Sequence, residues 1–149
     1  MHATEILQTY LDEVSQAVLT GDWETCCTGI CLPCHIISHD ESKVVTTVAD
    51  LKAGFDMFRA TLQAQRMSED ICLVESAQQL DRALIAGRYI THLIAGSHRL
   101  MPPFWSEMTL RLVDNTWHAA AVTNGLANSR WPLVRLELNT DSALEGSNE

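Results

Sequence analysis

The feature that most constrains this chain is a strand-rich stretch that begins near residue 71 and ends near residue 122. Val, Ile, Leu, Thr and aromatic residues dominate it, as is typical of β-strands. Gly and Pro residues and the pair Asp114-Asn115 mark its bends and turns. The strand segments are residues 71–80, 82–96, 105–112 and 117–122. This pattern predicts an antiparallel meander of long strands, which needs other elements packed across one of its faces.

Two helices are predicted near the start of the chain. Apolar residues recur at helical spacing after Thr4, which is a residue type that caps helix N-termini. Gly21 stands where a left-handed C-terminal residue belongs, and Asp22 can cap a shorter helix that begins at Trp23. Gly21-Asp22-Trp23 therefore predicts a corner between two helices.

A strand pair and a third helix are predicted between this corner and the meander. Residues 32–39 and 43–48 have strand-like composition and a polar connection, which predicts a small edge pair. Asp50 can cap the next helix, in which Phe55 and Phe58 lie on one apolar face. This face is large enough to close a core against the sheet.

Composition limits the class of protein. The chain has 149 residues, of which 46% are hydrophobic and 19% charged, so we expect one globular domain over residues 1–138. Residues 139–149 are small, polar and acidic, and we expect a disordered tail there. With 10 basic and 19 acidic residues, the chain is a poor match for nucleic acid. No apolar run is long enough to span a bilayer and the start lacks the pattern of a secretory signal, so we expect no membrane partner and a cytoplasmic protein.

The order of helix, short helix, strand pair, helix and meander resembles the nuclear transport factor two-like, or cystatin-like, α+β superfamily. The resemblance covers residues 4–136 and is carried by the Gly21-Asp22-Trp23 corner, the helix at 50–62 and the hairpin at 110–117. It implies a cone-like curved antiparallel sheet with about three helices on its concave face. It also implies a ligand pocket between helices and sheet, and a homodimer formed through the outer sheet face. Enzymatic relatives include ketosteroid isomerases, scytalone dehydratases and polyketide cyclases of the SnoaL type.

The resemblance to ketosteroid isomerases allows their catalytic positions to be checked singly. Their oxyanion-stabilising tyrosine corresponds to Val14, where the hydroxyl donor is missing. Their aspartate base falls at or beside Ser38, His39 and Asp40. Tyr10 lies one helical turn from the tyrosine position and is more typical of core packing. Isomerase activity of that type is therefore not expected.

A second acid–base hypothesis does not depend on the ketosteroid isomerase positions and is centred on His92. Alternation puts Arg88 and His92 on one face of a strand and Tyr89 on the other, and either face can be the concave one. If His92 faces the pocket, its imidazole can exchange a proton near neutral pH. In the alternative it is a partly exposed strand residue with a hydrogen bond. The candidate catalytic residues are His92, His39 and Asp40. The candidate ligand-binding residues are Tyr10, Trp23, Phe55, Phe58, Glu75, Trp105 and Trp117.

Four clustered cysteines are a further candidate site. Residues 31–35 match the C-x-x-C-H pattern of covalent haem attachment, but that chemistry requires export and a second haem ligand. A redox pair usually starts a helix, whereas this one leads into a strand. A zinc site needs a distant second pair of ligands. We therefore expect buried free thiols that act as small apolar groups, with no cofactor and no metal.

Two functions from different classes remain. The first is a pocket for a small apolar molecule, in a carrier or in an enzyme of the cyclase, isomerase or dehydratase type. The second is a non-catalytic homodimeric interaction module with a filled interior and an apolar outer sheet face. The sequence leaves open whether there is catalysis, and it does not identify a ligand.

Overall fold

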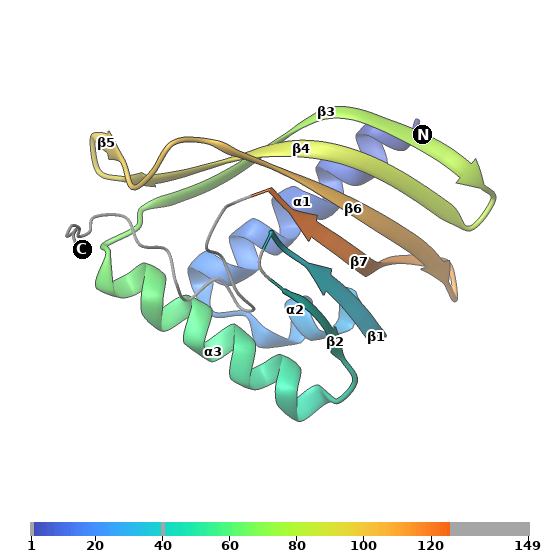
Figure 1. Ribbon diagram of the computed structural model, residues 1–149, viewed down its shortest axis with the longest axis horizontal. Coiled ribbons are helices and arrows are strands. Elements are labelled where there is room, and N and C mark those ends of the chain that lie inside the picture. Colours follow the sequence, from blue (N-terminus) through green and yellow to red (C-terminus); the bar gives the residue numbers. More distant parts are fainter. Residues whose placement is uncertain (1, 40, 126–149) are drawn as a thin grey trace.

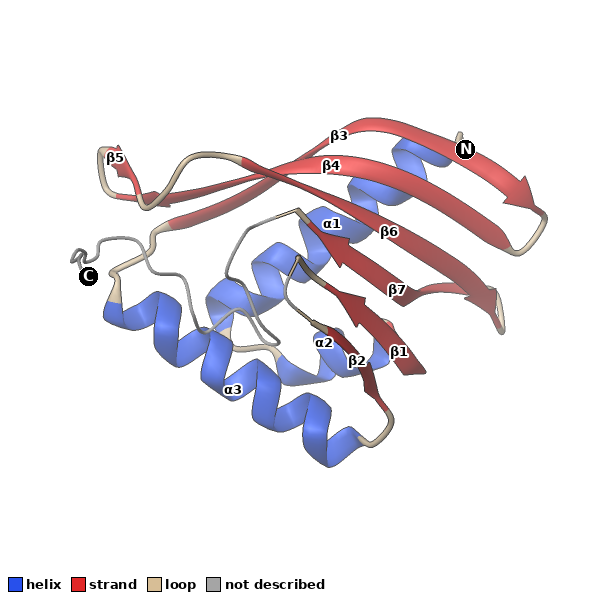
Figure 2. Cartoon of the chain, viewed as in Figure 1, coloured by secondary structure: helices blue, strands red, loops and turns tan. Residues whose placement is uncertain are grey.

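The computed structural model describes residues 2–39 and 41–125 and has an α+β architecture. Its helices are α1 (Ala3–Thr20), α2 (Trp23–Thr28) and α3 (Val48–Ala64). Its strands are β1 (Ile30–Ile37), β2 (Ser42–Val45), β3 (Glu69–Asp81), β4 (Leu84–Ala95), β5 (His98–Arg99), β6 (Phe104–Val113) and β7 (Thr116–Asn124). Figure 1 shows the sheet curling over the three helices, and Figure 2 shows that these helices gather on one side of it.

The strands form one mixed sheet in the order β2-β1-β7-β6-β4-β3, and β5 pairs with β4. The neighbours β3, β4, β6 and β7 are antiparallel, as the meander pattern predicts. The predicted edge pair is the antiparallel pair β1 and β2, but β1 also pairs with β7 in parallel. This parallel contact extends the meander into a half-barrel, because it brings residues early in the chain beside the last described strand.

The predicted helix corner is confirmed. Gly21 ends α1 with a φ of 79°, in the left-handed region that favours glycine. Asp22 caps α2 by accepting a hydrogen bond from the main-chain N–H of Thr25 at 3.2 Å. Two predicted caps were wrong. The first helix begins at Ala3, before Thr4, and Thr47 caps α3 by accepting a hydrogen bond from the N–H of Asp50 at 3.1 Å.

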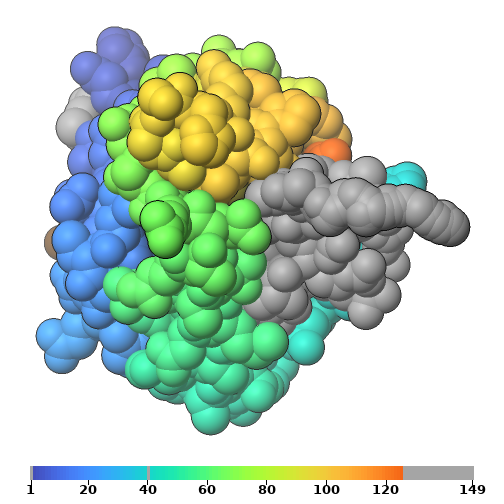
Figure 3. Space-filling view, turned by 90° about the vertical axis from the view of Figure 1, so that its left-hand side faces the viewer, coloured from blue at the N-terminus to red at the C-terminus, as the bar shows by residue number. Residues whose placement is uncertain are grey.

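The core consists of two apolar clusters. One lies between the first half of α1 and the sheet, and its central members include Leu7, Ile85 and Leu110, all fully buried. The other joins the end of α1 to α3 and the β5 end of the sheet. Figure 3 shows α3 in green beside the blue N-terminal helices and below the gold segment around β5. The two clusters together fix the helices against one face of the sheet.

Two parts of the chain that the sequence analysis singled out are not described by the structure. The predicted acidic tail, residues 139–149, and Asp40 lie outside the described residues. None of the helices in the described part is long and apolar enough to cross a membrane.

Candidate functional site

A cavity of about 210 Å³ lies between the three helices and the inner face of the sheet. The helices contribute Tyr10, Val14, Val18, Trp23, Cys26, Leu51, Gly54, Phe55 and Phe58 to its lining. The strands and their ends contribute Ile30, Cys34, Ile36, Ser38, Val45, Met108, Ala119, Val122 and Asn124. Most of these side chains are apolar, so the cavity favours hydrocarbon over water.

Aromatic side chains form the wall on the α2–α3 side. Leu51, Phe55 and Phe58 reach the cavity together because spacings of four and three residues share one face of a helix. The ring of Trp23 lies 5.3 Å from that of Phe55, centroid to centroid, at a tilted angle of 56°. Lys52 Nζ lies 5.7 Å from the Trp23 ring. This wall positions flat, rigid surfaces against whatever fills the cavity.

The ionisable groups in the lining are neutral at physiological pH. Tyr10 donates a hydrogen bond from its hydroxyl to the carbonyl of Gly29 at 2.6 Å, and burial raises the pKa of Tyr10 above its ordinary value. Burial also raises the pKa of Cys26 and of Cys34 to about 11 each. Among the described lining residues there is no Asp, Glu, His, Lys or Arg. The described part of the lining therefore carries no charge to meet a charged ligand.

Four of the seven predicted ligand-binding residues line this cavity, namely Tyr10, Trp23, Phe55 and Phe58. The other three do not. Glu75 is exposed and pairs with Arg88, whose Nε lies 3.3 Å from Glu75 Oε1. The Arg88 guanidinium lies 4.4 Å from the ring centroid of Trp105. Trp117 packs against the first core cluster.

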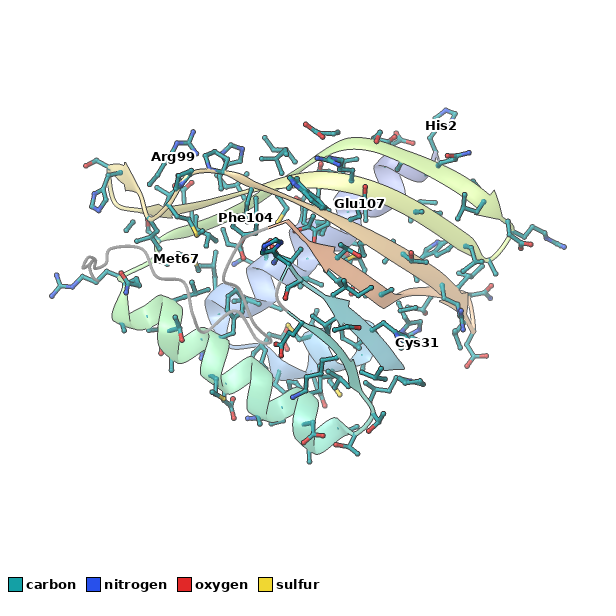
Figure 4. The ribbon with its side chains drawn as sticks, in the orientation of Figure 1. His2, Cys31, Met67, Arg99, Phe104 and Glu107 are labelled. Carbon is teal, nitrogen blue, oxygen red and sulfur yellow. The ribbon has the colours of Figure 1, made fainter. Side chains whose placement is uncertain are left out.

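The structure places His92 on the outer face of the sheet. Tyr89, Thr91 and Leu93 are buried on the inner face, and His92 alternates with them. Arg99 Nη1 donates to His92 Nδ1 at 2.6 Å, in an exposed contact near the β5 end, where Figure 4 labels Arg99. His92 thus lies across the sheet from the cavity.

The other two candidate catalytic residues are not brought to the cavity by the described part of the chain. His39 is exposed in the connection after β1, and Asp40 is outside the described residues. A catalytic role for His92, His39 and Asp40 therefore stays a prediction, without a shared site among the described residues.

Two of the residues compared with the catalytic positions of ketosteroid isomerases, Val14 and Ser38, line the cavity. Val14 faces it from α1, and Ser38 faces it from the end of β1. Neither side chain can exchange a proton near neutral pH. The Ser38 hydroxyl accepts a hydrogen bond from the N–H of Glu41 at 3.2 Å, so it also shapes the turn.

Sequence reasoning expected buried free thiols but did not place them in the cavity, and it missed the amide of Asn124. Cys26 and Cys34 are buried and free, whereas Cys27 and Cys31 are partly exposed. In the described part of the chain, no group of three or more His, Cys, Asp or Glu side chains is placed to hold a metal ion. Asn124 is a buried polar residue at the end of a strand whose inner face is otherwise apolar. Asn124 follows Val122 by two residues, so the two side chains share one face of the strand. That spacing is the sequence signal that could have placed Asn124 in the lining.

Comparisons with known proteins identify the fold. No model of a protein family matches the chain, and no curated protein matches it. An NTF2-like protein of unknown function from Shewanella oneidensis superposes with a TM-score of 0.62 at 12% identity, over 84% of this chain and 100% of the other. A domain of unknown function with a cystatin-like fold from Nostoc punctiforme superposes with a TM-score of 0.64 at 11% identity, over 84% of this chain and 78% of the other. An NTF2-like protein with a cystatin-like fold from Novosphingobium aromaticivorans superposes with a TM-score of 0.61 at 12% identity, over 87% of this chain and 84% of the other.

These likenesses are in backbone structure and not in sequence. They agree with the resemblance carried by the helix corner, the third helix and the hairpin. The order of elements, the curled sheet and the helices on its inner face are common to both lines of evidence. The chain therefore has the nuclear transport factor two-like, cystatin-like α+β fold.

Proposed function

We propose that this protein binds a small, uncharged, largely apolar molecule in the cavity between its helices and sheet. The observation that supports this is the lining, which joins aromatic and aliphatic side chains to a few neutral polar groups. A dry apolar cavity of about 150 Å³ can hold benzene. A cavity of about 210 Å³ therefore suits a molecule somewhat larger than benzene. Binding, and not acid–base catalysis by the lining, is the activity that these side chains support.

The test is calorimetric titration with isopropylbenzene, supported by the shift in melting temperature at saturation. Val45 lines the cavity from β2, and its neighbour Val44 is exposed on the other face of the same strand. We expect Val45→Phe to weaken binding at least about tenfold, because the larger ring takes up cavity volume. Val44→Phe makes the same chemical change outside the cavity and should bind as the wild type does. Failure of the wild type to bind either isopropylbenzene or its ketone counterpart acetophenone, or equal binding by a folded Val45→Phe variant, would refute the proposal.

An interaction module is the second candidate, and one feature of the outer sheet face favours it. Leu73 on β3 is 51% exposed. It pairs with Ile90 on β4, and Ile90 pairs in turn with Trp105 on β6. This apolar row can pair two copies of the chain through their sheets. Light scattering after size exclusion should then give a dimer, and Leu73→Lys should give a monomer with an unchanged cavity. A monomeric wild type would remove this candidate.

We also propose a cytoplasmic location. All five cysteines are free, which suits a reducing compartment. Fractionation of cells that express the full chain tests this location. Recovery of the protein from an oxidising compartment would contradict the proposal.

A further inference from the structure

A row of polar side chains crosses the inner face of the sheet and ends in the cavity. Ser38 and Asn124 each lie one residue beyond a paired position of the parallel strands β1 and β7, so they are neighbours on one face. Asn124 pairs with Ser106 on β6, and Ser106 pairs with Tyr89 on β4. The sheet therefore brings four polar side chains into one line, three from the adjacent strands β4, β6 and β7 and one from the residue that follows β1.

Tyr89, Ser106 and Asn124 are buried and Ser38 is half-buried, and burial of polar groups is costly unless hydrogen bonds compensate. Ser106 is 2% exposed and Asn124 is 8% exposed. Tyr89 shares a side-chain hydrogen bond with Ser106. An asparagine amide has two N–H donors and an oxygen that accepts twice, so one such group can bond a neighbour and a ligand together. Ser106 and Tyr89 continue the row away from the cavity, whereas Asn124 and Ser38 line the cavity itself.

The remaining polar groups of the lining are less suited to a ligand. The Tyr10 hydroxyl already donates its proton to Gly29. Cys26 and Cys34 hold weakly donating thiols that stay protonated. Among the described lining residues, the amide of Asn124 is the side chain with two N–H donors and an oxygen that accepts twice, and it lies on the sheet side of the cavity, away from Phe55 and Phe58 on α3.

Resting on the binding function proposed above, we infer that Asn124 recognises an uncharged hydrogen-bonding group of the ligand, such as a ketone, amide or alcohol. The apolar remainder of the ligand fills the space against the aromatic wall. A carboxylate is disfavoured, because it would lose its water without meeting a cation in the described lining. The ligand class is a small neutral molecule with one polar end.

Three probes with the same number and connectivity of heavy atoms test this assignment by calorimetry: acetophenone, isopropylbenzene and benzoate. In Asn124→Leu, which keeps the approximate shape of the side chain, acetophenone binding should weaken about tenfold, the effect of one lost hydrogen bond. Isopropylbenzene should bind this variant at least as well as the wild type. Thr123→Val changes the adjacent residue, which points to the opposite face, and should alter neither affinity. The wild type should bind benzoate far more weakly than acetophenone.

The infrared carbonyl frequency of acetophenone bound to the wild type gives a test that needs no variant. A frequency below that of acetophenone in hexane shows a hydrogen bond and supports the assignment. A hexane-like frequency, or an Asn124→Leu variant with unchanged preference between acetophenone and isopropylbenzene, overturns it while the binding function stands. Failure of both neutral probes to bind the wild type would instead refute the binding function itself.

Discussion

Arg59 on α3 lies against Gly21 at the end of α1. Its Nε donates a hydrogen bond to the carbonyl of Val18 at 2.8 Å. A Cβ on Gly21 would lie 2.8 Å from Arg59 Nη1. The guanidinium thus satisfies one of the last carbonyls of the helix and places a positive charge at its negative end. This contact links two of the helices that line the cavity.

Gly21→Ala should therefore destabilise the fold for two separable reasons. A non-glycine residue in the left-handed region costs about 1–2 kcal/mol, and the new methyl group must also displace Arg59. Gly96 also has a positive φ, of 63°, but nothing lies within 4 Å of a Cβ built there. Urea unfolding should show a larger loss for Gly21→Ala than for Gly96→Ala.

A double-mutant cycle checks the second reason. In an Arg59→Met background, the cost of Gly21→Ala should fall towards that of Gly96→Ala, because the displaced guanidinium is gone. Additive costs for Gly21→Ala and Arg59→Met would show that Arg59 does not hold this position.

The stability of the fold should decrease as the pH rises through the titration of Asp70. Burial raises the pKa of Asp70 to about 6, and Cys72 donates from its thiol to Asp70 Oδ1 at 3.7 Å. The folded state thus prefers the protonated carboxyl. The stability that this preference contributes is fully present below the unfolded-state pKa near 4 and is lost as the pH rises through about 6. The full difference corresponds to at most about 3 kcal/mol.

Asp70→Asn should consequently raise the free energy of unfolding at pH 8 by about 1–3 kcal/mol and change it little at pH 4. Denaturant titrations across this pH range measure the effect. Glu69→Gln, at the exposed neighbouring position, serves as the control. An Asp70→Asn variant less stable than the wild type at pH 8 would contradict the prediction.

The sequence pattern was sufficient for much of the fold because local signals and tertiary structure agree. Gly21 and Asp22 form the predicted corner, and Asp114 and Asn115 both take the positive φ that a tight hairpin turn requires. Helix starts were less certain, since Thr47 and Asp50 are both good capping residues only three positions apart. In the structure Thr47 keeps the extended backbone of an N-cap and its hydroxyl accepts from the N–H of Asp50, so the helix begins at Val48.

The candidate site was less predictable because it depends on which sheet face the helices cover. Alternation separates His92 from Tyr89 without saying which is inside. The packing of α1 and α3 against the sheet is what makes one face the inner one, and it leaves His92 and Trp105 outside the cavity. Ser38 and Asn124 were harder still, because a parallel pairing between distant segments makes them neighbours.

The cysteines should fall into two classes of reactivity. Cys26, Cys34 and Cys72 are buried, and burial raises the pKa of each, to about 11, 11 and 12. At pH 8 a thiol of pKa near 11 is ionised in only about one molecule in a thousand, and the thiolate is the reactive form. Cys27 and Cys31 are partly exposed.

Titration with a thiol reagent at pH 8 should therefore give two fast groups, and three more after unfolding. Peptide mass spectrometry should assign the fast pair to Cys27 and Cys31. Saturating isopropylbenzene should slow Cys26 and Cys34 further but not Cys72, which does not line the cavity. Equal rates for Cys34 and Cys31 in the folded protein would contradict the buried position of Cys34.

Tyr10→Phe separates a structural hydroxyl from a ligand-binding one. The Tyr10 hydroxyl donates to Gly29, whose carbonyl also accepts a hydrogen bond from the N–H of Ala119 at 2.8 Å. Because that carbonyl keeps one partner, the substitution should lower the free energy of unfolding by only about 0.5–1.5 kcal/mol. Acetophenone affinity should stay unchanged, since the hydroxyl proton is already used within the protein. If Tyr10→Phe weakened acetophenone binding as much as Asn124→Leu does, ligand recognition would extend to the Tyr10 end of the cavity, and Asn124 would lose its special role.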